Sequence, residues 1–125
     1  MARILIAEDE EALCAMCARA LAADGHQVAT ARDGSEALEI LVREQGRFDL
    51  LLTDVRMPIM DGIALSLAAA RDFPDLTVLL MTGYADQRER AQGLDALIHD
   101  VLPKPFSLAA LRDAIREALA VKARE

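Results

Sequence analysis

The sequence predicts an α/β domain in which helices cover both faces of a parallel β-sheet. Five short apolar runs alternate with five helical patterns, and this alternation favours parallel strands joined by helical crossovers. The central runs are apolar without interruption, which is typical of strands buried on both faces. The 125 residues, 54% of them hydrophobic and 28% charged, suit one soluble domain with its own core.

The first half of the chain predicts two strands and two helices. Arg3 to Ala7 is the first strand, and the helix that follows it ends at Asp24-Gly25. His26 to Ala31 mixes apolar and polar residues, as suits a strand at the edge of a sheet. Asp33 stands three residues before Glu36, as in a capping box, and predicts the start of the second helix.

The middle of the chain predicts two buried strands around a third helix. Phe48 to Asp54 is an apolar run, and Asp54 stands where the strand ends. A loop leads to a helix from about Ile63 to Asp72, which Pro74 stops. Leu76 to Met81 is the next buried strand.

The last third predicts two helices and one short strand. Asp86 to about Leu94 is a charged and weakly amphipathic fourth helix. Ile98 to Pro103 is the fifth strand, and Ser107 caps the final helix. The apolar stripe of that helix is Leu108, Leu111, Ile115 and Leu119.

Charge and composition argue against several classes of protein. The net charge of −7 lacks the cationic footprint of a nucleic-acid binder. No apolar run approaches the roughly 20 residues that span a bilayer, and no signal peptide is visible, so we expect a cytoplasmic protein.

Cys14 and Cys17 have the spacing of a redox or metal motif, but they lie inside a helical pattern without a second ligand pair. We expect Cys17 to pack inward and Cys14 to lie nearer solvent.

Charged and hydroxyl residues follow the predicted strands where each one ends. Right-handed crossovers bring the carboxyl ends of parallel strands to one edge of the sheet, so these side chains should meet. They are Glu8, Asp9, Asp54, Thr82 and Lys104. Crowded carboxylates need a cation, and oxygen ligands favour Mg²⁺ or Mn²⁺. A carboxylate beside such an ion can attack a phosphoryl group, with an ammonium and a hydroxyl holding the phosphoryl oxygens.

Four stretches of the sequence, in order and at the usual spacing, resemble the receiver domain of two-component response regulators. They are Ile4 to Asp9, Leu51 to Gly62, Met81 to Gly83 and Leu102 to Phe106. The resemblance implies a three-layer, flavodoxin-like (CheY-like) fold with five helices and a five-stranded parallel sheet of order 2-1-3-4-5. It covers residues 1–125, which we expect to form a single receiver domain with no output domain.

The same resemblance implies a metal-assisted phosphorylation site. Asp54 corresponds to the phosphoacceptor of the family. Asp9 corresponds to the direct ligand of Mg²⁺ and Glu8 to a ligand through water, and the main-chain carbonyl of Arg56 completes the protein ligands. Glu8 stands where the family usually has an Asp, but it keeps the charge.

The resemblance also implies a conformational switch. Thr82 corresponds to the hydroxyl that turns toward the phosphoryl group, and Lys104 to the ammonium that pairs with it. Pro105 is expected to follow a cis peptide bond. Val101 stands where the family usually carries a Tyr or Phe that moves with the Thr, so Tyr84 is the candidate to move instead.

The implied function is a phosphorylation-dependent binding switch. A histidine kinase or histidine phosphotransfer protein would phosphorylate Asp54, and a partner protein would read the face of the fourth helix, fifth strand and fifth helix. We expect no contact with nucleic acid or membrane, and no enzymatic activity beyond self-catalysed phosphorylation and dephosphorylation of Asp54. A narrower likeness to the CpdR type of single-domain receiver implies a protease adaptor system as the partner.

Two other functions use the same residues. A phosphorelay intermediate would pass the phosphoryl group from Asp54 to a second histidine-bearing protein. A small Mg²⁺-dependent phosphatase would share the aspartyl nucleophile, but Arg56 stands where its second acid would be, and no substrate-binding cap is present.

Overall fold

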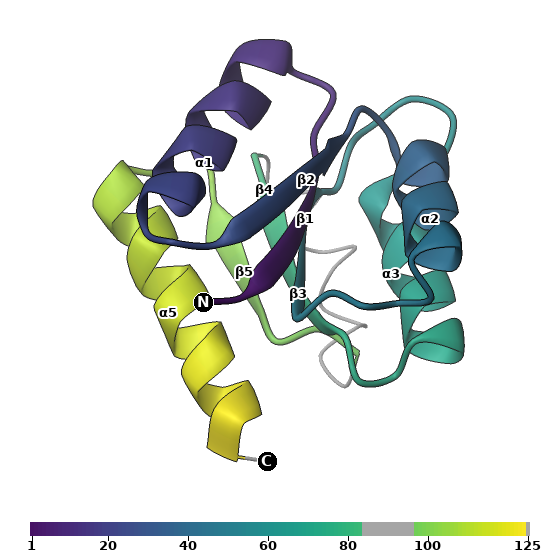
Figure 1. Cartoon of the computed structure of the whole chain (residues 1–125). Helices are drawn as coiled ribbons and strands as arrows, with labels where there is room; N and C mark the ends of the chain where they lie inside the picture. The colour runs from purple at the N-terminus through teal and green to yellow at the C-terminus, as the bar shows by residue number, and fades with distance from the viewer. Residues whose placement is uncertain (84–96, 125) are drawn as a thin grey trace.

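The computed structural model is a parallel sheet between two layers of helices (Figure 1). It describes residues 1–83 and 97–124, with the side chains of residues 123 and 124 left out. The strands are β1 (Arg3–Ala7), β2 (Gln27–Ala31), β3 (Leu50–Asp54), β4 (Thr77–Thr82) and β5 (Asp100–Pro103). The helices are α1 (Glu11–Ala23), α2 (Gly34–Arg43), α3 (Gly62–Asp72) and α5 (Leu108–Arg124). The strand order is β2-β1-β3-β4-β5, as predicted.

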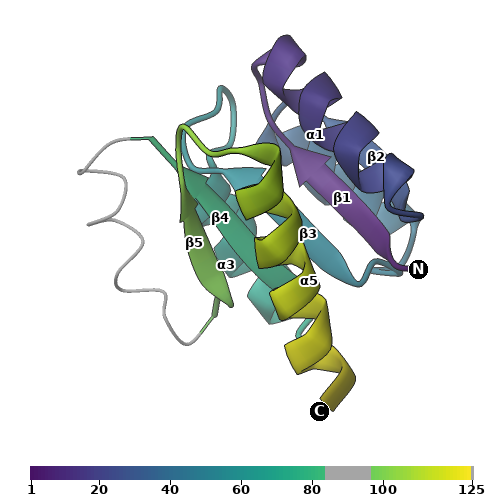
Figure 2. The same cartoon turned by 90° about the vertical axis from the view of Figure 1, so that its left-hand side faces the viewer.

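Alternate residues of each inner strand enter two separate cores, one on each face of the sheet. On β3, Leu51 packs toward α2 and α3, whereas Leu50 and Leu52 pack toward α1 and α5. All three are fully buried, which explains why this strand is apolar without interruption. Figure 2 shows α1 and α5 lying side by side over the nearer face of the sheet.

The edge position predicted for β2 is confirmed, because β2 ends the strand order and pairs with β1. The helix start after it is also confirmed: the Asp33 carboxylate accepts a hydrogen bond from the Glu36 N–H at 2.8 Å. The Glu36 carboxylate in turn accepts the N–H of Arg32, one residue earlier than in a standard capping box. The Ser107 hydroxyl caps α5 by accepting the Ala110 N–H at 3.0 Å.

Three strands are shorter than the sequence predicts, and β4 is displaced by one residue because it runs from Thr77 to Thr82. β3 begins at Leu50, two residues after Phe48. His26 donates its N–H to Leu21 O and therefore completes the turn that closes α1 instead of starting β2. Ile98 and His99 precede β5, although the His99 N–H already reaches Val78 O at 2.7 Å. Apolar content alone does not separate a strand from the turn that leads into it.

Four helices are present in the described residues. The helix predicted over 86–94 lies outside them, and so does Tyr84. None of the described helices is long and apolar enough to cross a membrane. Cys17 is fully buried and Cys14 half-buried, both as free thiols, which confirms the interpretation of these residues as ordinary helix positions.

Gly62 brings the start of α3 against the end of β3. Its N–H donates to Val55 O at 2.8 Å, and a Cβ on this residue would lie 1.9 Å from the main-chain oxygen of Asp54. Because that neighbour is backbone, it cannot move aside without displacing Asp54. Glycine is therefore required here for close approach and not for an unusual φ angle.

We expect Gly62→Ala to lower the free energy of unfolding by about 3 kcal/mol, because an added methyl must displace backbone in a packed region. Gly25→Ala is the matched control: Gly25 has φ +94 but nothing within 4 Å of an added Cβ. That change should cost about 1 kcal/mol, the usual penalty of a left-handed residue. Urea denaturation measures both, and equal losses would contradict the close-approach explanation.

Candidate functional site

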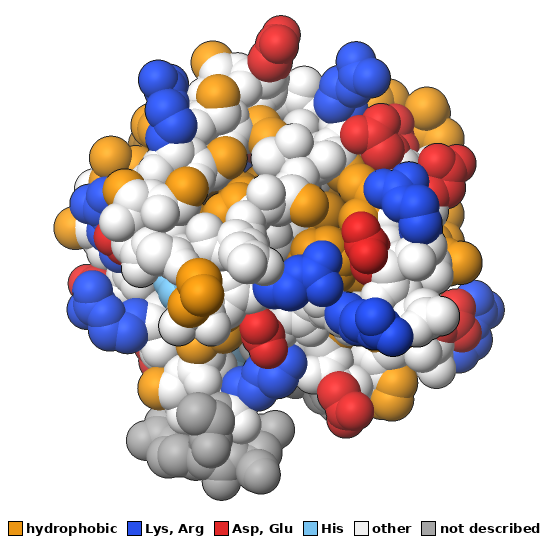
Figure 3. Space-filling model, in the orientation of Figure 1, with side chains coloured by type: hydrophobic (Ala, Val, Ile, Leu, Met, Phe, Trp, Pro, Cys, Tyr) orange, Lys and Arg blue, Asp and Glu red, His pale blue; other side chains and the backbone are white. Residues whose placement is uncertain are grey.

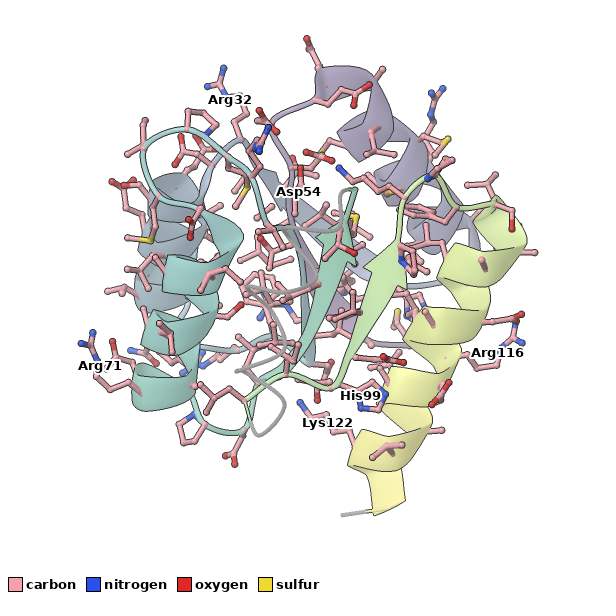
Figure 4. All side chains as sticks on the ribbon, turned by 180° about the vertical axis from the view of Figure 1, so that it is seen from behind. Arg32, Asp54, Arg71, His99, Arg116 and Lys122 are labelled. Carbon is pink, nitrogen blue, oxygen red and sulfur yellow. The ribbon has the colours of Figure 1, made fainter. Side chains whose placement is uncertain are left out.

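The carboxyl ends of four strands meet at one edge of the sheet. The register pairs Ala7 with Thr53, Asp54 with Met81, and Thr82 with Pro103. Residues that follow these positions therefore lie at one level although they are far apart in sequence. Figure 4 shows Asp54 at this edge, with His99 and Lys122 at the opposite one.

Lys104 joins two buried carboxylates at this edge. Its Nζ lies 2.8 Å from Glu8 Oε1 and 3.0 Å from Asp54 Oδ2. The Glu8 side chain is 1% exposed and that of Asp54 8%, whereas Lys104 is 21% exposed. Two buried negative charges would be costly without this cation, because removing one partner of a buried pair leaves an uncompensated charge.

The local backbone fixes the orientation of Asp54. Its Oδ1 accepts the N–H of Val55 at 2.9 Å, so the other carboxylate oxygen faces Lys104. The main-chain oxygen of Asp54 accepts the Thr53 hydroxyl at 2.9 Å. Both bonds come from residues adjacent in sequence, which makes the carboxylate part of the strand end and not of a flexible loop.

Glu8, Asp9 and Asp54 form an acidic cluster that could hold a cation. One ligand atom from each lies within 4.8 Å of the others, and Asp9 is the exposed member. An all-oxygen set of this kind suits Mg²⁺ or Mn²⁺, and the exposed Asp9 leaves the site accessible from solvent. The residues present therefore fit the expected metal.

Burial, more than mutual repulsion, shifts the titration of Glu8. Desolvation raises the pKa of this carboxyl from 4.5 to about 7, the Lys104 hydrogen bond opposes that rise, and the charge of Asp54 adds to it. Burial would lower the pKa of Lys104, but its hydrogen bonds to Glu8 and Asp54 leave that pKa raised. Lys104 therefore stays protonated at neutral pH. The sequence indicates that the carboxylates are crowded, but it does not show how deeply Glu8 is buried.

Thr82 lies at the end of β4 and is fully buried. Its Oγ1 has no hydrogen-bond partner among the described residues, which is unusual for a buried hydroxyl. Its main-chain oxygen accepts the N–H of Lys104 at 2.6 Å, so the two residues are joined through backbone.

The remaining predicted positions surround this centre. Arg56 is exposed and lines the cleft above Asp54. The peptide bond between Lys104 and Pro105 is cis. Val101 is half-buried and packs against the core on the α2 and α3 side, on the strand that leads to Lys104.

A cleft of about 710 Å³ opens above the acidic cluster. Besides the predicted residues it is lined by Glu10, Leu13, Met16, Gly83 and Phe106. These residues were not among the predicted site residues. The acidic run that contains Glu10 and the position of Phe106 directly after Pro105 were the available signals, whereas Leu13 and Met16 looked like ordinary core positions of a helix.

A doubly wound parallel sheet with buried acids and a lysine at its carboxyl edge defines the receiver class of signalling domains. The chain matches the response regulator receiver domain family over residues 4–116, and it belongs to that family. Receiver domains act in two-component signalling, where histidine kinases or phosphotransfer proteins phosphorylate them on an aspartate.

Individual relatives agree with this assignment. The chain is 40% identical over 117 residues to the response regulator MprA of Mycobacterium leprae (strain TN), covering 94% of this chain and 50% of MprA. It thus spans about half the length of the curated relatives it matches. A receiver domain protein from Clostridium thermocellum superposes with a TM-score of 0.89, 27% identity and 98% coverage of both chains. A CheY-like receiver domain protein from Methanospirillum hungatei JF-1 gives 0.88 and 28%, covering 98% of this chain and 96% of that one.

We expect the Glu8 carboxyl to make the stability of the metal-free protein pH-dependent. The folded state holds this proton up to about pH 7, whereas the unfolded chain releases it near 4.5. Glu8 therefore makes its full stabilising contribution to the free energy of unfolding below pH 4.5. This contribution is lost as the pH rises through about 7. Glu8→Gln, which resembles the protonated acid, should not lose this contribution.

Urea denaturation in the presence of a chelator at pH 5 and pH 8 measures the effect. We compare the free energy of unfolding of Glu8→Gln with that of wild type at each pH. The difference, variant minus wild type, should be larger at pH 8 than at pH 5, by at most about 3 kcal/mol. Glu39→Gln, an exposed change of the same kind on α2, should show no such trend. A constant difference between Glu8→Gln and wild type at both pH values would show that the pKa of Glu8 is not raised.

Proposed function

We propose that this receiver domain accepts a phosphoryl group on Asp54 from a histidine-bearing protein and signals by changing its affinity for another protein. One observation carries the proposal: Asp54 is the carboxylate that Lys104, Glu8 and Asp9 surround at the base of an open cleft. It is buried enough to be held in place and faces a solvent-accessible space.

In the proposed reaction a carboxylate oxygen of Asp54 attacks the phosphorus of the donor, and the bond from phosphorus to the donor nitrogen breaks in line with it. Mg²⁺ or Mn²⁺ bound by Glu8, Asp9, Asp54 and the Arg56 carbonyl would neutralise negative charge on the phosphoryl oxygens. The Lys104 ammonium, already 3.0 Å from Asp54, is positioned to pair with one of those oxygens. Its contact with Asp54 then passes to the phosphoryl group.

Thr82 supplies the link from chemistry to conformation in this proposal. Its buried hydroxyl has no partner in the described residues, and a phosphoryl oxygen on Asp54 would provide one. A small movement of Thr82 toward Asp54 would bias the ends of β4 and β5, which share the bond from Lys104 N–H to Thr82 O. Val101 fills the position of the usual aromatic with a smaller side chain, and the role expected for Tyr84 stays a prediction.

The partner surface stays a prediction as well. On α5, Arg112 pairs with Asp24 at 3.2 Å, and Arg116 pairs with Asp113 at 3.2 Å. These residues form local ion pairs and carry no information about which protein would bind. The phosphorelay role, the CpdR-type partner, the protease adaptor system and the stand-alone organisation likewise stay predictions. The expected absence of enzymatic activity on external phosphate esters also stays a prediction.

The test is phosphorylation by acetyl phosphate with Mg²⁺, followed by intact mass. Wild type should gain one phosphoryl group, and Asp54→Asn should gain none, because an amide is not a nucleophile toward phosphorus. Asp75→Asn serves as the matched control, since Asp75 is exposed at the opposite edge of the sheet, just before β4. It should behave as wild type does.

Chelation of Mg²⁺ should abolish the mass gain in wild type without unfolding the protein. A gain that persists in Asp54→Asn would show that another residue is the acceptor. Transfer of the group from Asp54 to a purified histidine phosphotransfer domain would favour the relay function over the binding switch.

A further inference from the structure

The free edge of β2 has a defined set of unpaired backbone groups. In a parallel pair, residues alternate between bonding to the neighbouring strand and facing away from it. Gln27 donates its N–H to Ala2 O, and Ala31 O accepts the N–H of Glu8, so residues 27, 29 and 31 face β1. The N–H and C=O groups of Val28 and Thr30 therefore point away from the sheet.

The chain itself provides acceptors for the outward N–H groups at both ends of this free edge. The outward N–H of His26 donates to Leu21 O at 3.2 Å, and that of Arg32 donates to Glu36 Oε1 at 3.3 Å. Between these two points, the outward groups of Val28 and Thr30 have no partner within the part of the chain that the structure describes. The result is an open window of one N–H and one C=O on each of two residues.

β2 lacks several of the features that protect edge strands, although it is short, with five residues. Edge strands are commonly protected by lysine, proline or a bulge, and Gln27–Ala31 contains no lysine or proline and pairs with β1 in regular register. At its carboxyl end lies a cleft of about 640 Å³. It is bordered by the small side chains of Ala15, Ala18, Thr30 and Ala31 and by the charged side chains of Glu8, Asp9, Glu11, Arg19, Arg32 and Glu36. Figure 3 views the molecule from this side and shows apolar side chains interspersed with charged ones on this face.

We propose that the β2 edge binds a second copy of this chain, with the two β2 strands antiparallel about a two-fold axis through Ala29. Val28 of each copy then faces Thr30 of the other, and every outward N–H meets an outward C=O. This antiparallel register forms four backbone hydrogen bonds and joins two five-stranded sheets into one.

The symmetry of the window favours a second copy over an unrelated peptide. The two outward residues stand one on each side of Ala29, and the closed positions, His26 and Arg32, stand three residues from Ala29 on either side. A second β2 strand has the same arrangement, so each strand can bond the outward N–H and C=O groups of the other. An unrelated peptide would leave its own far edge open.

The pairing leaves each phosphorylation cleft free. Asp54 lies at the end of β3, two strands from the β2 edge, and antiparallel pairing places the two Asp54 clefts at opposite ends of the joined sheet. Each copy carries a net charge of −7, so long-range repulsion opposes association at low salt.

Sedimentation velocity on the full chain, from about 5 to 500 µM, tests the proposal at concentrations where weak protein pairs form. The mass should rise from 13.6 kDa toward twice that value, and more readily as salt is raised. Deuterium exchange should slow at the amides of Val28 and Thr30 as concentration increases, because only pairing removes these groups from water.

Substitutions at Thr30 separate the edge from other surfaces. Thr30→Pro removes one N–H of the window and should weaken association at least tenfold, since two of the four bonds are lost. Thr30→Val, which keeps the N–H and the branched shape, should associate as wild type does. Thr30→Lys places a charged residue on the edge and should also prevent pairing. It tests the same edge without the risk that proline disturbs the fold. All three should still take a phosphoryl group from acetyl phosphate.

Several results would overturn the proposal. A chain that stays monomeric at every concentration and salt, or a dimer unaffected by Thr30→Pro and Thr30→Lys, would do so. Concentration-dependent protection on α5 without protection at Val28 and Thr30 would place the interface elsewhere. Protection of these amides only by an added extended peptide would identify the occupant as another chain.

Discussion

The ammonium of Lys104 between the carboxylates of Glu8 and Asp54 is the interaction on which the site depends. Both acids are removed from water, and both lie within 3.0 Å of the same Nζ. A buried carboxylate without a cation would take up a proton or disrupt the fold. The lysine therefore allows Asp54 to stay at the strand end as a potential nucleophile, in a place where its orientation is fixed.

That arrangement depends on the fold in a direct way. Glu8, Asp54 and Lys104 follow three different strands, and the parallel register sets their relative heights. Gly62 holds the loop after β3 against the main chain of Asp54, and the bond from Lys104 N–H to Thr82 O joins the last two strand ends. A change at any of these points would alter the distances at the site without touching a charged residue. The site thus depends on backbone geometry as much as on its side chains.

The resemblance to receiver domains implied the order of the strands, whereas the convergence of the charged residues follows from patterns in the sequence itself. Uninterrupted apolar runs identify inner strands, and the handedness of crossovers brings their ends together. The predicted strand starts at His26, Phe48 and Ile98 were wrong. Residues just before a strand can be as apolar as the strand itself, so composition does not mark where the strand begins. The burial of Glu8 and the lining by Leu13 and Met16 depend on how α1 packs over the sheet, which periodicity does not determine.

The same limit applies to the unpaired groups of the molecule. The sequence does not reveal that, among the described residues, the Thr82 hydroxyl and the outward backbone groups of Val28 and Thr30 have no hydrogen-bond partner. Both features depend on where the surrounding chain lies in the folded structure. These two features lie on different sides of the protein and concern different events. The first belongs to the response to phosphorylation, and the second to association between copies.

The central claim is that Glu8, Asp9 and Asp54 converge into one divalent cation site. Nuclear magnetic resonance with substoichiometric Mn²⁺ tests it directly, since the paramagnetic ion broadens the signals of nearby amides. The amide signals of Glu8, Asp9 and residues 54 to 56 should broaden first, and excess Mg²⁺ should reverse the effect. Broadening centred on another acidic part of the chain, such as Glu36 and Glu39, would contradict the account.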